Sequence, residues 1–159
     1  PHSKYYIIGD GIEERKLRKL IKKLNLEKSV IFLHWLPREQ LFALYAEIDV
    51  LLHPSLHEQF GYVILEAMAA AKPIICLDVG GPSQLVSSEY GYKIKINGLN
   101  YIIEQISKAL CILAQNPHLM KSMGAKARQH ANAFWCWPVV TDRMLNIITN
   151  SYRLFDKIQ

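Results

Sequence analysis

The 159-residue sequence has no apolar run of transmembrane length, and it contains only three cysteines. Cys76, Cys111 and Cys136 are odd in number, and none has the spacing of metal ligands. We therefore expect reduced, structural thiols in a cytoplasmic protein, with the inner face of the membrane as an alternative location. The N-terminus lacks a basic patch followed by an apolar core, so we expect no secretory signal peptide.

Repeats, linkers and low-complexity tracts are also missing, which predicts one domain spanning residues 1–159. Half of the residues are apolar, enough for a core of ordinary size. The formal charge of +5 is mild. It fits an anionic small ligand or a membrane surface, and we expect no nucleic-acid partner.

Short apolar runs alternate with helical patterns along the chain. This alternation predicts an α/β fold, with a Rossmann-like, mostly parallel sheet covered by helices on both faces. The expected strands are residues 4–8, 30–33, 50–52, 74–77 and 90–96. The expected helices are residues 12–24, 37–48, 61–71, 83–86, 100–115, 117–133 and 138–155.

The stretch from His53 to Pro73 joins a buried strand, a short loop and a helix. If the helix begins near Gly61, the N–H groups of Gly61, Tyr62 and Val63 point out of its end without helical partners. Their partial positive charge favours a diphosphate, and a glycine lets the ligand approach the backbone closely.

Two acids flank this helix start. Glu58 lies in the loop, and Glu66 falls on the helical face of Tyr62 and Val63. Two carboxylates around a phosphate-binding helix end suit hydroxyl groups of a ribose on one side and of a sugar on the other. A single acid pair at this spacing also occurs by chance, so the pair alone does not decide the function.

Further segments make a family resemblance. They are Glu58-x7-Glu66 enclosing Phe60-Gly61, the run Glu66-Ala-Met-Ala, the loop Asp78-Val-Gly-Gly81, and Met123-Gly124 with Ala127-Arg128. Together they resemble the retaining glycosyltransferases of family four, which have the GT-B fold. The resemblance implies the C-terminal half of that fold, which binds the nucleotide-sugar donor. It also implies that a first βα unit and an N-terminal acceptor-binding domain, the partner of this half, would precede Pro1.

The resemblance also implies roles for individual residues. Glu66 is expected at the ribose hydroxyls and Glu58 at the donor sugar; these two are the candidate catalytic residues, although neither is expected to transfer a proton. Trp35 and Leu36 are expected to read the base through main-chain groups. The remaining donor-binding candidates are Phe60, Gly61, Tyr62, Val63, Gly80 and Gly81.

No cofactor or metal is expected, since the sequence has no Asp-x-Asp and His34 has no second ligand beside it. Three positions depart from the family pattern: His34 and Ala71 stand where glycine is usual, and Gln59 where small residues are common. Two other functions stay open. One is a different GT-B enzyme, such as a sugar-nucleotide epimerase, and the other is a non-catalytic nucleotide-binding module.

The first helix is strongly basic on one side. Its apolar stripe of Leu17, Leu20, Ile21 and Leu24 is expected to pack on the sheet, and Asp10 is a candidate N-cap. The charged side is expected to be solvated, with contact to an anionic membrane as the alternative. Its six cations are Arg15, Lys16, Arg18, Lys19, Lys22 and Lys23.

Overall fold

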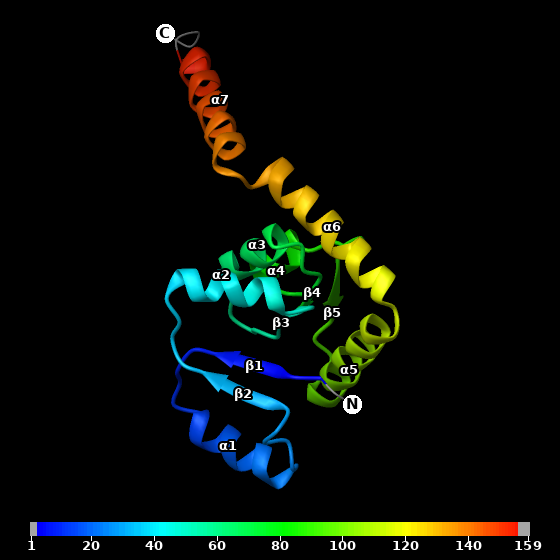
Figure 1. Ribbon diagram of the computed structural model, residues 1–159. Coiled ribbons are helices and arrows are strands. Elements are labelled where there is room, and N and C mark those ends of the chain that lie inside the picture. Colours follow the sequence, from blue (N-terminus) through cyan, green and yellow to red (C-terminus); the bar gives the residue numbers. More distant parts are fainter. Residues whose placement is uncertain (1–2, 156–159) are drawn as a thin grey trace. The chain divides into compact units, whose positions relative to one another are not determined.

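The computed structural model describes residues 3–155, and the chain divides into two compact units (Figure 1). Unit 1 comprises residues 1–44 and unit 2 residues 45–159. In unit 1, β1 (Tyr5–Ile8) pairs in parallel with β2 (Val30–Leu33), and α1 (Glu14–Lys23) connects them. Helix α2 (Arg38–Glu47) begins in unit 1 and ends in unit 2.

The start of α1 differs from the sequence prediction. Glu13, and not Asp10, occupies the N-cap position, and it makes no side-chain capping hydrogen bond. The prediction of Asp10 as the cap is therefore wrong. Its carboxylate binds the His34 ring instead, because the loop after β1 and the loop after β2 leave the same end of a parallel strand pair.

Unit 2 contains a three-stranded sheet in the order β3-β4-β5. Both strand pairings are parallel, with Leu51 opposite Ile74 and Ile74 opposite Gly91. All four residues of the central strand β4 are buried, as expected for a strand covered on both faces. The elements are β3 (Leu51–His53), α3 (Tyr62–Ala69), β4 (Ile74–Leu77), α4 (Gly80–Leu85), β5 (Gly91–Ile94), α5 (Leu99–Gln115), α6 (Pro117–Phe134) and α7 (Trp137–Phe155).

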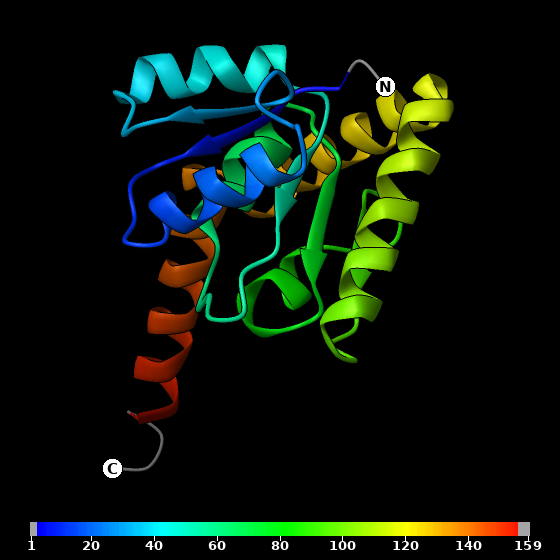
Figure 2. The same ribbon diagram turned by 90° about the horizontal axis from the view of Figure 1, so that it is seen from below.

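Helices cover both faces of this sheet. Ile75 and Leu77 of β4 belong to a buried cluster with Ala109 and Leu113 of α5 and Met123 of α6. Alternate strand residues point to the opposite face, where α3 packs on β3 and β4. In the two ribbon views α5 runs beside β5 (Figures 1 and 2). The predicted α/β class, parallel pairing and two-sided covering are thus confirmed.

The strands of the described residues form two hydrogen-bonded sheets, β1-β2 and β3-β4-β5, where the sequence predicted one. Alternation of strands and helices predicts that strands are parallel, but it does not specify which strands are neighbours. The order of neighbours is set by the tertiary fold.

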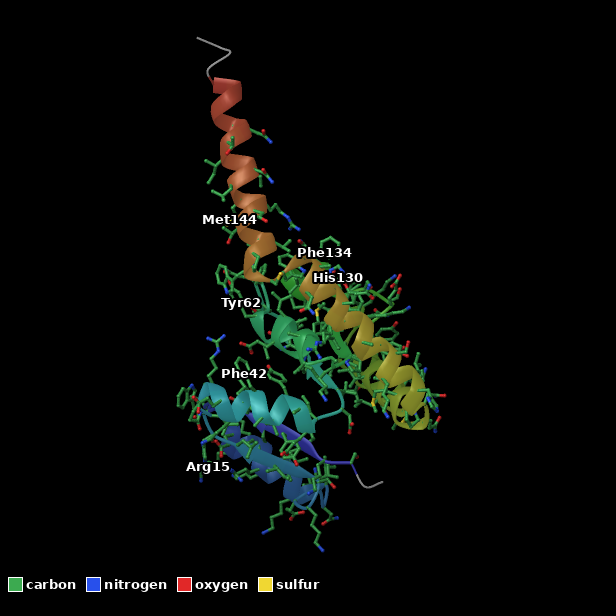
Figure 3. The ribbon with its side chains drawn as sticks, turned by 45° about the horizontal axis from the view of Figure 1, so that its top comes forward. Arg15, Phe42, Tyr62, His130, Phe134 and Met144 are labelled. Atoms are coloured by element: carbon green, nitrogen blue, oxygen red, sulfur yellow. The ribbon has the colours of Figure 1, made fainter. Side chains whose placement is uncertain are left out.

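Helix α7 leaves the body of unit 2 (Figures 1 and 3). Several apolar side chains along it are at least half exposed, and Figure 3 labels one of them, Met144. They are Trp137, Met144, Leu145, Ile147 and Ile148. No helix within residues 3–155 combines the length and the apolar character needed to cross a bilayer.

The end of α3 contains a residue in a strained conformation. Ala71 has a φ of 58°, in the left-handed region that favours glycine. The Ala71 N–H donates to the Met68 carbonyl and the Lys72 N–H to the Ala67 carbonyl, which is the hydrogen-bond pattern of a Schellman motif. The fold therefore places a Cβ where helix ends usually have none.

We predict that Ala71→Gly raises the free energy of unfolding by about 1 kcal/mol, because glycine relieves the left-handed strain. Urea denaturation of the two proteins measures the difference. The control is Ala69→Gly, at the last residue of the helix, where φ is not positive; glycine relieves no strain there and should lower the free energy of unfolding. A loss of stability in Ala71→Gly as well as in Ala69→Gly would contradict the proposed backbone strain at Ala71.

Candidate functional site

The β3–α3 loop is held by the carboxylate of Glu58. Its Oε1 accepts hydrogen bonds from the Gly61 N–H at 3.0 Å and from the Phe60 N–H at 3.4 Å. Helix α3 then begins at Tyr62, with Gly61 at the N-cap position and a φ of 90°. The prediction that the Gly61 N–H points freely to a ligand is wrong, because Glu58 already accepts from it. The N–H groups of Tyr62 and Val63 follow in the first turn.

A second loop packs directly on the first. Gly80 and Gly81 form the first turn of α4, and the Gly81 N–H donates to the Glu58 carbonyl at 3.2 Å. A Cβ on Gly81 would lie 2.4 Å from the Phe60 carbonyl oxygen, and one on Gly80 would lie 2.2 Å from that of Glu58. Both glycines are needed because the two backbones touch. The structure therefore brings together Glu58, Phe60, Gly61, Gly80 and Gly81.

His53, at the end of β3, faces the second oxygen of Glu58. The His53 Nε2 lies 3.7 Å from Glu58 Oε2 and, within the described part of the chain, has no hydrogen-bond partner. Burial lowers the pKa of His53, and the negative charge of Glu58 only partly opposes this. The imidazole is therefore neutral at pH 7 and does not form a full ion pair with Glu58.

Glu66 has a partner that the sequence did not indicate. The buried Tyr45 hydroxyl, at the end of α2, lies 3.2 Å from Glu66 Oε2 and 3.4 Å from the Val63 carbonyl. Burial, and then the Glu66 carboxylate, raise the pKa of Tyr45, so the hydroxyl stays protonated and donates. Tyr45 thus orients the Glu66 carboxylate. Nothing in the local sequence pattern indicates this contact, because Tyr45 occupies a position typical of an ordinary core residue.

Aromatic rings surround the start of α3. Phe60 lies 4.9 Å from Tyr62 and 5.6 Å, edge to face, from Trp135, as measured between ring centroids. Tyr62 is 73% exposed, and Figure 3 labels its ring at the start of the helix. Trp135 anchors Phe60 from the end of α6, so the loop is supported from its far side.

The two predicted base-reading residues, Trp35 and Leu36, belong to unit 1, on the loop after β2. The Trp35 N–H donates to Asp10 Oδ2 at 3.4 Å, and Asp10 Oδ1 lies 2.5 Å from His34 Nδ1. Trp35 is 75% exposed. Asp10 thus occupies a main-chain group that the resemblance implied for the base, and the base-reading role stays a prediction.

His34 has neighbours that the sequence did not show. One ligand atom from each of Asp10, Glu14 and His34 lies within 4.8 Å of the others. All three side chains already have partners, since Asp10 binds His34 and Glu14 binds Arg18 at 2.7 Å. These ion pairs account for the cluster without a cation, and the absence of a metal in the enzyme stays a prediction.

The site in unit 2 is therefore a helix start with two oriented carboxylates, Glu58 and Glu66, and a tightly packed glycine turn. Hydroxyl groups of a ligand are the natural partners of such carboxylates, and an anionic group is the natural partner of the helix start. Parallel strands followed by this kind of loop define an open-sheet α/β protein, a class in which ligands bind at the carboxyl ends of the strands.

Comparison with known proteins gives the family. The family described as "Glycosyl transferases group 1" matches residues 1–130, and the chain belongs to it. A GDP-mannose-dependent alpha-mannosyltransferase of Mycolicibacterium smegmatis is 33% identical over 87% of this chain. A GDP-mannose-dependent monoacylated alpha-(1-6)-phosphatidylinositol monomannoside mannosyltransferase of Corynebacterium glutamicum is 28% identical over 96% of it. The chain spans 34% of the length of the first relative and 40% of the second.

Solved structures agree with this assignment. Sucrose-phosphate synthase from Thermosynechococcus elongatus matches 94% of this chain and 38% of its own, with 25% identity and a TM-score of 0.79. Anabaena Alr3699/HepE, solved in complex with UDP, matches 94% of this chain and 42% of its own. Its TM-score of 0.81 at 24% identity shows the common fold. The predicted resemblance to GT-B glycosyltransferases is thus confirmed.

We predict that Gly81→Ala lowers the free energy of unfolding by about 1–3 kcal/mol, because the new methyl group overlaps the Phe60 and Gln59 carbonyl oxygens. Denaturant unfolding measures the loss. Gly11→Ala is the matched control, because a Cβ there meets no atom within 4 Å. An unchanged stability for Gly81→Ala would mean that the two loops do not touch.

We predict that His34 titrates above its ordinary pKa. The hydrogen bond to Asp10 and then the charge of Asp10 raise the pKa of His34, while the hydrogen bond to His34 lowers the pKa of Asp10. The pair therefore stabilises the fold between the two titrations. Its contribution is lost as the pH rises through the folded-state pKa of His34, and also as the pH falls through that of Asp10.

The measurement is an NMR titration of the His34 ring protons in the parent chain and in Asp10→Asn. The variant should bring the His34 pKa down toward the ordinary value. The ring signals of His118, for which no ion pair is found among the described residues, serve as the internal reference. Equal His34 pKa values in the two proteins would contradict the ion pair.

Proposed function

We propose that this chain is the donor-binding half of a retaining glycosyltransferase that moves a sugar from a nucleotide diphosphate sugar to a glycan, lipid or small-molecule acceptor. The observation that carries the proposal is the site in unit 2, where two oriented carboxylates flank the start of α3. Family membership supports sugar transfer, and the relatives named above use GDP-mannose, while HepE binds UDP.

The proposed roles follow from the geometry. Glu66, held by Tyr45, accepts hydrogen bonds from the ribose hydroxyls, and Glu58 Oε2 accepts from a hydroxyl of the donor sugar. The Tyr62 and Val63 N–H groups meet the diphosphate. In the reaction, the bond from the anomeric carbon to the diphosphate breaks and a bond to the acceptor oxygen forms, with retention of configuration. Stabilisation of the departing diphosphate is then the main catalytic task, and no metal or cofactor is assigned.

The strand order supports the proposal that a first βα unit precedes this chain. A doubly wound sheet commonly has the order 3-2-1-4-5-6. If β1 to β5 are the second to sixth strands, the order within each unit, β2-β1 and β3-β4-β5, matches a stretch of that common order. The exposed apolar side chains of α7 are, in turn, suited to contact with the N-terminal acceptor-binding domain. This half alone should not transfer sugar.

We also infer a cytoplasmic enzyme, with the inner face of the membrane as the alternative location. Cys76, Cys111 and Cys136 are all free, in agreement with a reducing compartment. Burial raises the pKa of Cys76 to about 11, so that its thiol is an unreactive part of the core.

We predict that one nucleotide sugar among UDP-, GDP- and ADP-sugars shifts the backbone amide NMR signals of residues 58–66 when it is titrated into the chain. Glu66→Gln should weaken this binding about tenfold, because a neutral amide loses the charge-assisted hydrogen bonds to the ribose. Glu89→Gln, an exposed acid of unit 2 on a different loop, is the matched control.

The deciding experiment repeats this titration on a longer chain that contains the first βα unit. If that longer chain also shows no shift with any donor, the donor-binding proposal is wrong. For the whole enzyme, release of free nucleotide together with an extended acceptor separates a transferase from an epimerase. A non-catalytic module would lose no function on Glu58→Ala or Glu66→Ala.

A further inference from the structure

The cationic charge of the chain is concentrated in unit 1. Residues 1–44 contain nine lysines and arginines against five acids, a net +4 of the total of +5. Much of it lies on α1, whose apolar and charged residues are on opposite sides. Two of the six α1 cations have partners, since Lys16 binds Glu13 at 2.9 Å and Arg18 binds Glu14 at 2.7 Å.

The other four cations are exposed and form no ion pair among residues 3–155. They are Arg15, Lys19, Lys22 and Lys23. Their spacings of four, three and one place them on one side of the helix, along about 12 Å of its axis. Figure 3 labels Arg15 among the side chains that project from this ribbon. The row is too long for one phosphate group.

Ile12 adds an apolar side chain to this row. It precedes the helix and is 96% exposed. It lines an open hollow of about 590 Å³ together with Arg15, Arg18, Lys19 and Lys22. Glu14, the acid that also lines the hollow, is paired with Arg18. A free phosphate would neutralise the cations, but it would leave the exposed isoleucine in water, whereas a bilayer offers both anionic groups and an apolar environment.

We propose that this cationic face, formed by Ile12, Arg15, Lys19, Lys22 and Lys23, docks on an anionic lipid bilayer. Lipid phosphates neutralise the row of cations, and Ile12 enters the boundary between headgroups and acyl chains. The proposal concerns unit 1, and it rests on the alternative location at the inner face of the membrane but not on the donor site. Lipid binding is measured without a donor and donor binding without lipid, so that either can fail alone.

The test is flotation of the 159-residue chain with two kinds of vesicle, one of phosphatidylcholine and one in which part of it is replaced by phosphatidylglycerol. We expect binding to the anionic vesicles only, weakening as salt is raised. The triple variant Arg15→Glu, Lys19→Glu and Lys22→Glu should lose on the order of a hundredfold in affinity, since each basic residue contributes about a fivefold factor at such a surface.

The matched control carries the same charge change on α6, with Lys121→Glu, Lys126→Glu and Arg128→Glu, and should bind far better than the α1 variant. Ile12→Ser keeps every charge and should weaken binding severalfold. Circular dichroism and thermal melts confirm that each variant is folded, and Lys19→Gln with Lys22→Gln replaces the triple variant if that one unfolds.

Three results would overturn the proposal. They are equal binding to neutral and anionic vesicles, an equal loss in the α1 and α6 triple variants, and unchanged binding of Ile12→Ser. A fourth would be displacement of the chain from vesicles by inorganic phosphate where chloride at the same ionic strength has no effect, because the face would then be a site for a free anion.

Discussion

The candidate site depends on one interaction, the hydrogen bonds between the Glu58 side chain and the backbone of its own loop. By accepting from the Phe60 and Gly61 N–H groups, the carboxylate fixes the turn that starts α3. The carbonyl of the same residue accepts from Gly81, which joins the second loop to the first. One residue thus sets the position of the helix start, of the glycine turn and of its own second carboxylate oxygen. A functional side chain that also holds its loop cannot be replaced without moving the site.

The second acid is positioned in a different way. Glu66 lies inside a helix, where the backbone already fixes its Cα, and only the carboxylate needs orientation. The Tyr45 hydroxyl supplies it from a helix that is distant in sequence, and the same hydroxyl reaches the Val63 carbonyl. The two acids are therefore held by independent means, one by main-chain donors and one by a phenol. A perturbation of the β3–α3 loop should leave the orientation of Glu66 largely intact.

Local patterns were sufficient for much of this structure. The alternation of apolar runs and helical stripes predicted the elements of both units, and the loop with Glu58 and Gly61 was predicted at the start of a helix. The Gly80–Gly81 turn was also placed beside a strand end. These features depend on residues that are close in sequence, for which periodicity and turn chemistry carry the information.

Contacts between distant residues could not be predicted in this way. Tyr45 meets Glu66 across 21 residues, and Asp10 meets His34 across 24. Asp10 looked like a helix cap because it lies just before an acidic first turn, and only the pairing of β1 with β2 shows that a better partner is near. The Gly61 N–H was expected to be free for a related reason. The spacing of residues in the sequence does not show whether a loop acid folds back and accepts hydrogen bonds from its own backbone.

The charge of the site limits what its residues could do for the proposed diphosphate ligand. Within the described residues, no lysine or arginine forms an ion pair with Glu58 or Glu66, and His53, which faces Glu58, is neutral. A diphosphate placed beside two carboxylates would be repelled, and the partial charge of one helix start offsets only about half an elementary charge. The remaining positive charge has to come from side chains outside this site. The carboxylates are therefore suited to select a ligand by its hydroxyl groups, and binding of the proposed diphosphate requires cations that do not belong to this site.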